Sequence, residues 1–155
     1  FDATAACTDI AALVAEKARV TQAALAALAQ GQDPLIYTAE GPDDPAVARF
    51  KQAASGKDMA AINETVGVAL GEVLADILRQ SGVRRAVVSG GDTSGYATRQ
   101  LGIFALSALA PTIPGAALFK AHATGEMDGL ELALKGGQMG SPDYFGWIRD
   151  GGGAR

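Results

Sequence analysis

Residues 84–102 read RRAVVSGGDTSGYATRQLG, and this stretch decides which fold we expect for the chain. Residues 86–88 are apolar and mostly β-branched, which predicts a buried strand that ends at the paired glycines Gly90 and Gly91. The next residues can accept hydrogen bonds from free backbone N–H groups and favour a helix start; they are Asp92, Thr93 and Ser94. A strand, a glycine turn and a helix N-terminus in this order predict an anion site, most often for phosphate.

The rest of the chain extends this unit into an α/β domain. Apolar residues at helical spacing predict a helix capped by Thr8 or Asp9, a short one from Pro45 and a long one over 59–80 capped by Asp58, with further short helices over 94–101 and 142–149. Short apolar runs predict strands over 35–38, 86–88, 103–109, 116–122 and 130–134. The strands at 86–88 and 103–109 flank a helix as a βαβ unit, and the last two suggest a hairpin. We therefore expect a single domain with a mixed, partly parallel sheet flanked by helices.

Composition and charge limit the classes of protein. The chain has 155 residues, of which 48% are hydrophobic, enough for one domain over residues 1–150 followed by a disordered tail over 151–155. The net charge of −4 and the lack of a basic cluster argue against a nucleic-acid partner. No run approaches the roughly 20 apolar residues of a membrane helix, so no membrane partner is expected. The single cysteine fits a reducing compartment, so we expect a cytoplasmic protein.

Two familiar phosphate motifs do not match the central stretch. The Walker A loop requires Lys and then Ser or Thr where this chain has Tyr96 and Ala97. The dinucleotide fingerprint requires glycine where this chain has Asp92. The glycine turn therefore predicts a phosphate site outside these two classes, or else a tight turn packed under a loop.

Hydrolase and metal chemistry have little support. A nucleophile elbow around Ser89 would need glycine at position 87, which is valine, and the one histidine, His122, is expected to be structural. With only Cys7 besides, the sequence predicts no histidine or thiolate metal site. No catalytic base can be named.

A second glycine run follows the last predicted strand. Residues 135–143 read KGGQMGSPD, and two glycine loops at strand ends strengthen each other as candidates for one phosphate site. Asp92 fits such a site only with a cation between its carboxylate and the phosphate. Asp92 is therefore expected to orient a Mg²⁺-bound phosphate or a ribose hydroxyl, or simply to cap the helix.

These residues resemble a known family, the four-carbon acid sugar kinases, long catalogued as a domain of unknown function. The nucleotide-binding C-terminal domain of that family carries a motif similar to residues 88–95, followed by a match to Leu101 and Gly102. It ends with a Lys-x-Gly-x-x-Gly-x-x-Asp pattern, which residues 135–143 match, and Pro114 with Gly115 matches an intervening Pro-Gly. The resemblance covers nearly the whole chain.

The resemblance implies ATP-dependent, Mg²⁺-assisted phosphorylation of a four-carbon sugar acid such as a tetronate or 3-oxo-tetronate. It implies that the first motif contacts ATP phosphates or ribose and that the second closes over the nucleotide. Lys135 would approach a phosphate oxygen or face solvent. The implied nucleotide-binding residues are Gly90, Gly91, Asp92, Thr93, Ser94, Gly95, Lys135, Gly136, Gly137 and Gly140.

In that family an N-terminal domain supplies the sugar-acid site, and a Gly-Ser-x-Ser type segment opens the nucleotide domain. Neither is found in this chain, which starts at Phe1, so we expect an N-terminally truncated fragment that is inactive alone. The catalytic base is expected on the absent domain, and a homodimer is left open. The alternatives are a non-catalytic interaction module or type III effector-like domain, and a nucleotide sensor that is not a kinase.

Overall fold

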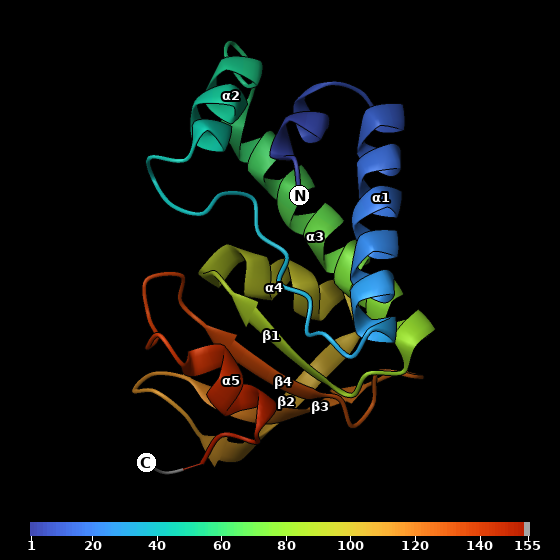
Figure 1. Ribbon diagram of the computed structural model, residues 1–155, viewed down its shortest axis with the longest axis vertical. Helices are drawn as coiled ribbons and strands as arrows, with labels where there is room; N and C mark the ends of the chain where they lie inside the picture. The colour runs from blue at the N-terminus through green and yellow to red at the C-terminus, as the bar shows by residue number, and fades with distance from the viewer. Residues whose placement is uncertain (154–155) are drawn as a thin grey trace. The chain divides into compact units, whose positions relative to one another are not determined.

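The computed structural model describes residues 1–153 (Figure 1). The chain forms two compact units, Phe1–Ser81 and Gly82–Arg155, and each unit is described by itself below.

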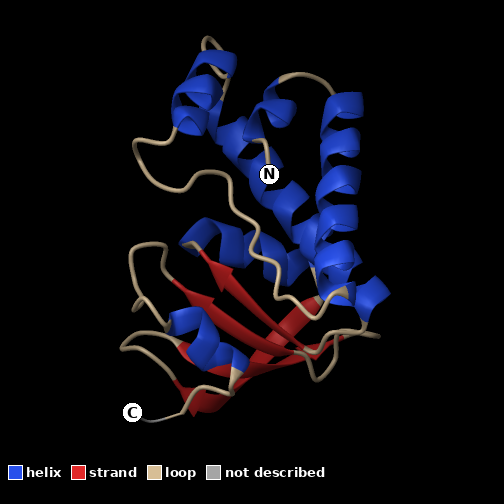
Figure 2. Cartoon of the chain, in the orientation of Figure 1, coloured by secondary structure: helices blue, strands red, loops and turns tan. Residues whose placement is uncertain are grey.

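The first unit is helical (Figure 2). A 3-10 helix η1 (Ala3–Cys7) precedes α1 (Ile10–Ala29), α2 (Pro45–Ala53) and α3 (Met59–Ser81). The sequence predicts how each long helix begins: the Asp9 carboxylate accepts from the backbone N–H of Ala12 at 2.8 Å, and that of Asp58 from Ala60 at 2.9 Å. These caps satisfy N–H groups that have no partner within the helix.

The core of this unit lies between α1 and α3. Small and branched side chains at helical spacing bury one face of each helix, with aromatic and aliphatic residues packed on the edge; the cluster is Val20, Ala24, Val73 and Ile77 with Phe1, Leu28 and Ile36. An ion pair from Lys17 to Glu72, 2.7 Å long, also joins the two helices. Packing of this face, more than helix propensity, stabilises the pair.

The strand predicted at residues 35–38 is wrong, because this segment is irregular. Ile36 packs against the core between α1 and α3, but Leu35 and Tyr37 are 61% and 46% exposed. A strand needs a ladder partner, and among the described residues no strand pairs with this segment. The segment has the composition of a strand, but it is an extended stretch of irregular chain.

The second unit is a four-stranded mixed sheet flanked by two helices. Its strands are β1 (Arg85–Ser89), β2 (Ile103–Pro111), β3 (Ala117–Ala123) and β4 (Glu131–Lys135), in the order β1-β4-β3-β2. β1 and β4 are parallel, while β3 is antiparallel to both β4 and β2. The predicted mixed, partly parallel sheet and the predicted hairpin are confirmed.

Two helices cover this sheet, and both differ in extent from the prediction. α4 (Gly91–Gln100) begins three residues earlier than expected, and α5 (Tyr144–Arg149) begins two residues later. The predicted βαβ unit is present in a wider form, because β1 and β2 occupy opposite edges of the sheet and the β3–β4 hairpin lies between them. α5 packs on the face that carries Val87, Leu118 and Ala133, and α4 lies on the other side of the sheet (Figure 1).

Only part of the predicted tail falls within the described residues. Gly152 and Gly153 donate backbone hydrogen bonds to the carbonyls of Trp147 and Pro111, at 2.9 and 3.0 Å. Residues 154–155 lie outside the described residues, so the expectation for this tail stays a prediction. Among residues 1–153, no helix is both long and apolar enough to cross a membrane.

Candidate functional site

The two glycine runs meet at one edge of the sheet. β1 and β4 are parallel neighbours, with Ser89 opposite Lys135, so the carboxyl ends of both strands lie side by side at this edge of the sheet. The backbone N–H of Gly90 donates to the carbonyl of Lys135 at 2.9 Å, which continues the ladder one residue past β1. Carboxyl ends of neighbouring parallel strands are where open α/β sheets bind ligands.

The two runs also approach each other closely. A Cβ atom built on Gly137 would lie 4.0 Å from the Cα atom of Gly90, so a side chain at position 137 would cover the first turn. Gly90 itself has a φ of +128°, which L-residues rarely adopt, and a Cβ there would lie 3.1 Å from Thr93 Oγ1. The turn at Gly90 therefore requires glycine for backbone and steric reasons together.

The N-terminus of α4 opens at this edge. Its N-cap is Gly90, which has no side chain to cap the helix, so the first backbone N–H groups keep their partial positive charge for another acceptor. Gly91 and Gly95 add open space, because no atom outside the adjoining residues and backbone of α4 lies within 4 Å of a Cβ built on either. A phosphate site needs free hydrogen-bond donors and a backbone that a ligand can approach, and the N-terminus of α4 has both.

The polar side chains of the first motif have different surroundings. Ser94 turns inward, where its hydroxyl donates to the carbonyl of Gly90 at 2.7 Å. Thr93 is half-buried beside Gly90, and Asp92 is exposed in the first turn of α4. The alternative that Asp92 caps the helix is wrong, because the N-cap is Gly90.

The second motif differs from its prediction at Lys135. A solvent-facing lysine was one expectation, but Lys135 is only 9% exposed. Its Nζ donates to the carbonyl of Gly136 at 3.2 Å and lies 5.7 Å from the centre of the Tyr144 ring. Gly137 and Gly140 remain exposed on the outer side of the same loop.

The first turn of α4 offers the carboxylate of Asp92 to a Mg²⁺ ion bound to a nucleotide. Mg²⁺ is commonly held by one or two carboxylates together with substrate phosphates, so Asp92 suits a metal that arrives with ATP. Among the described residues, no cluster of three or more His, Cys, Asp or Glu could hold a metal by itself.

The first unit contains a cavity that the sequence does not predict. It is a cavity of about 690 Å³ whose lining includes four carboxylates and one cationic side chain, Arg49. The carboxylates are Asp2, Glu40, Asp43 and Asp44. The only sequence signal is the run of Asp, Gly and Pro over residues 40–45, which is typical of any surface loop.

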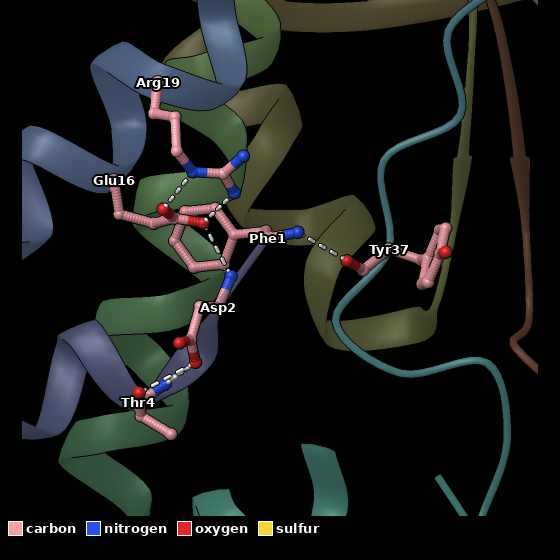
Figure 3. A network of polar contacts seen from close by, with 6 residues as sticks. All are labelled: Phe1, Asp2, Thr4, Glu16, Arg19 and Tyr37. Carbon is pink, nitrogen blue, oxygen red and sulfur yellow. Dashed lines mark hydrogen bonds and ion pairs between the residues drawn. The ribbon is translucent and has the colours of Figure 1, made fainter. Parts of the chain in front are cut away.

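Hydrogen bonds keep this acidic cavity charged. Backbone N–H groups of Ala46 and Glu40 lower the pKa of Asp44 below its ordinary value, and the Thr4 hydroxyl and backbone do the same for the pKa of Asp2. Figure 3 shows the Asp2 carboxylate with Thr4, next to Phe1, whose amino group donates to the Tyr37 carbonyl at 2.8 Å. The carboxylates that line the cavity repel the negatively charged phosphates of ATP, so the cavity is a poorer nucleotide site than the glycine edge.

The fold and the paired glycine segments define an α/β domain with a candidate anion site at the carboxyl ends of two parallel strands. Residues 1–145 match the model of the nucleotide-binding C-terminal domain family, and the chain belongs to this family. The resemblance drawn from residues 88–95 and 135–143 is thereby confirmed.

Curated relatives carry kinase names. The chain is 45% identical over 140 residues to a 3-oxo-isoapionate kinase of Paraburkholderia graminis, covering 88% of this chain and 30% of the relative. It is 39% identical over 127 residues to a 3-oxo-tetronate kinase of Cupriavidus necator, covering 81% and 27%. The chain therefore spans less than a third of the length of these relatives.

A solved structure shares the fold. A crystal structure of a Haemophilus influenzae protein superposes with a TM-score of 0.75 and 22% sequence identity, covering 97% of this chain and 33% of that one. At this identity the likeness concerns the fold alone.

Proposed function

We propose that this chain is the ATP-binding part of a kinase that phosphorylates a four-carbon acid sugar, a tetronate or 3-oxo-tetronate. One observation carries the proposal: the carboxyl ends of β1 and β4 bring the two glycine runs together beside the uncapped N-terminus of α4, where a Cβ built on Gly137 would lie 4.0 Å from the Cα atom of Gly90. The names of the two relatives support the substrate class, since both are named as kinases of 3-oxo compounds.

In this proposal the chain binds ATP mainly through its backbone. The N–H groups at Gly91, Asp92 and Thr93 face the phosphates, and the carboxylate of Asp92 holds the Mg²⁺ that accompanies them. The loop over 135–140 lies along the other side of the nucleotide. Phosphoryl transfer depends on positioning and on neutralising phosphate charge, and these backbone donors supply both for the nucleotide half of the reaction.

The sugar-acid site and the catalytic base are assigned to the part of the relatives that this chain does not match, about 70% of their length. Residues 1–150 would then be one nucleotide-binding domain that does not turn over substrate alone. We place the intact enzyme in the cytoplasm, where ATP is available, and leave a homodimer as a prediction to be measured.

Titration with Mg·ATP and ADP, followed by calorimetry, tests the nucleotide site. Gly91→Val places a Cβ where no atom outside its own helix turn lies within 4 Å, so the added side chain is aimed at a ligand. Gly41→Val is the matched control, because Gly41 also has ordinary φ and open space but lines the acidic cavity. We expect saturable binding in the wild type and in Gly41→Val, and its loss in Gly91→Val.

The opposite pattern, with loss only in Gly41→Val, would move the nucleotide to the acidic cavity and contradict the proposed site. The kinase activity is tested in an enzyme of the relatives' full length that carries this domain. ATP turnover that requires 3-oxo-tetronate supports the kinase, whereas ATP binding without turnover on any 3-oxo sugar acid supports a nucleotide sensor. Absence of nucleotide binding there supports an interaction module.

A further inference from the structure

The end of β4 carries a buried lysine that the proposed chemistry does not use. Lys135 is 9% exposed, and among the described residues no carboxylate forms an ion pair with its ammonium. The ammonium donates a hydrogen bond to the carbonyl of Gly136, at 3.2 Å. Burying an ammonium group is costly unless something compensates, so this position calls for a reason.

The ammonium group lies inside the loop that follows it. Gly136, which accepts its hydrogen bond, begins the loop. At the other end, a Cβ built on Gly140 would lie 3.7 Å from Lys135 Cε and 3.9 Å from Nζ. Gly140 has a φ of +141°, which lets the backbone turn tightly around the lysine. The Lys135 side chain is therefore bonded to the start of the loop over 136–140 and lies in the space that a side chain at its other end, position 140, would enter.

Tyr144 closes the loop from the side of α5. It is 1% exposed, its ring centre lies 5.7 Å from Lys135 Nζ, and its Cβ lies 3.9 Å from a Cβ built on Gly140. A cation near an aromatic face is stabilised electrostatically, more so where water is excluded. The Tyr144 hydroxyl is buried and has no hydrogen-bond partner among the described residues, so the ring is the part that matters here.

We propose that Lys135 is a positioning residue: held by Tyr144, it orders the glycine loop over 136–140 from within and does not contact the phosphate. The inference rests on the proposed function in one respect, that this loop lines the nucleotide. Without the ammonium, the loop loses the hydrogen bond at Gly136 and the packed side chain beside Gly140. A nucleotide then has to order the loop as it binds, and its affinity falls.

The first test needs no nucleotide. Amide hydrogen exchange is measured over 136–140 in the wild type, Lys135→Met, Tyr144→Leu and Tyr144→Phe. We expect exchange at this loop to rise about tenfold in Lys135→Met and in Tyr144→Leu, and to stay unchanged in Tyr144→Phe, which keeps the ring. Unchanged loop exchange in Lys135→Met would overturn the proposal.

Global stability separates this role from a merely structural one. Methionine fills a similar volume without a buried charge, so Lys135→Met is expected to leave the urea midpoint unchanged or higher while loop exchange rises. A lower midpoint with uniformly faster exchange throughout the second unit would instead assign Lys135 to general stability.

The second test adds nucleotide. A positioning role predicts that Lys135→Met weakens ATP and ADP by the same factor, with an unchanged dependence on salt. A direct phosphate contact predicts a larger loss for ATP and a weaker salt dependence, and would overturn the proposal. If a wild-type protein of the relatives' full length binds neither nucleotide, the proposed function fails, while the exchange result for the free loop still decides the role of Lys135.

Discussion

The glycines at the glycine edge differ in the physical reason for which each position requires glycine. Gly90 is required by its own backbone, since its φ is +128° and a Cβ would crowd Thr93. Gly90→Ala is therefore expected to lower the free energy of unfolding by about 1–3 kcal/mol, measured by urea denaturation. Gly91→Ala is the control: it has ordinary φ and open space, and should shift stability by less than about 0.5 kcal/mol. Equal losses in both variants would contradict this distinction.

A second residue-scale prediction concerns acid stability and Glu16. Its carboxylate accepts from Arg19 Nε at 2.7 Å and from the Asp2 backbone N–H at 2.7 Å (Figure 3), and the bond from Arg19 is the main cause that lowers its pKa below the ordinary 4.5. A carboxylate with a lowered folded pKa stabilises the fold fully above its ordinary pKa of 4.5, and this contribution is lost as the pH falls through the folded pKa. Glu16→Gln should thus be less stable than the wild type at about pH 7, and the difference should shrink by about pH 3.

Urea denaturation of both proteins at the two pH values measures this effect. Thr65→Val serves as a control, because the Thr65 hydroxyl donates to the carbonyl of Ala61 in its own helix and does not titrate. A Glu16→Gln difference that stays the same at the acidic pH would contradict the assignment to this carboxylate.

The candidate site shows how far residue patterns reach. The motif at 88–95 was visible because a strand, a glycine turn and a helix start are neighbours in sequence. The burial of Lys135 was not visible, because it depends on Tyr144, nine positions away, and on how α5 docks on the sheet. Local order predicts a local turn, whereas burial depends on contacts between distant segments.

At the scale of elements, Arg85 ties three of them together. Its Nε donates to Glu131 Oε2 and its Nη1 to the carbonyl of Arg149, both at 2.5 Å, so it links β1, β4 and the C-terminus of α5. Arg85→Ala is expected to cost about 1.5 kcal/mol in urea denaturation, because half-buried charged hydrogen bonds are lost. Arg79→Ala, which removes an exposed pair with Asp76 at 3.4 Å, should cost less than about 0.5 kcal/mol. Similar costs would show that Arg85 has no linking role.

Helices with strong apolar periodicity could be predicted from the sequence. Elements whose existence or bounds depend on hydrogen-bond partners elsewhere in the chain could not. The helix at Met59–Ser81 follows from apolar residues every three or four positions and from its Asp58 cap. The run at 35–38 has the composition of a strand but no ladder partner, and α4 starts at Gly91 because the glycine turn is tighter than the pattern of Asp92 and Thr93 suggests. A strand or a helix start is completed by hydrogen bonds that composition does not contain.

Strand order belongs to the whole chain and is the feature that sequence reasoning reached least well. The segments that flank α4 are parallel strands, but they lie at opposite edges because the β3–β4 hairpin inserts between them. This insertion makes β4 the parallel neighbour of β1 and so brings the second glycine run to the first. A sequential βαβ pair would have placed the two runs apart.

At the whole-chain scale, two candidate sites compete for the nucleotide, the glycine edge and the acidic cavity, and hydrogen exchange across the chain distinguishes them. With Mg·ATP at about 100 times the dissociation constant, binding should add about 2.7 kcal/mol to global stability. Added protection is expected at 89–95 and 135–140, where backbone donors face an anion, and not at 37–49, where Asp43 and Asp44 repel one. Gly91→Val should remove the added protection while leaving exchange without nucleotide unchanged. Protection confined to 37–49 would contradict the assignment, because the acidic cavity would then bind ATP despite its charge.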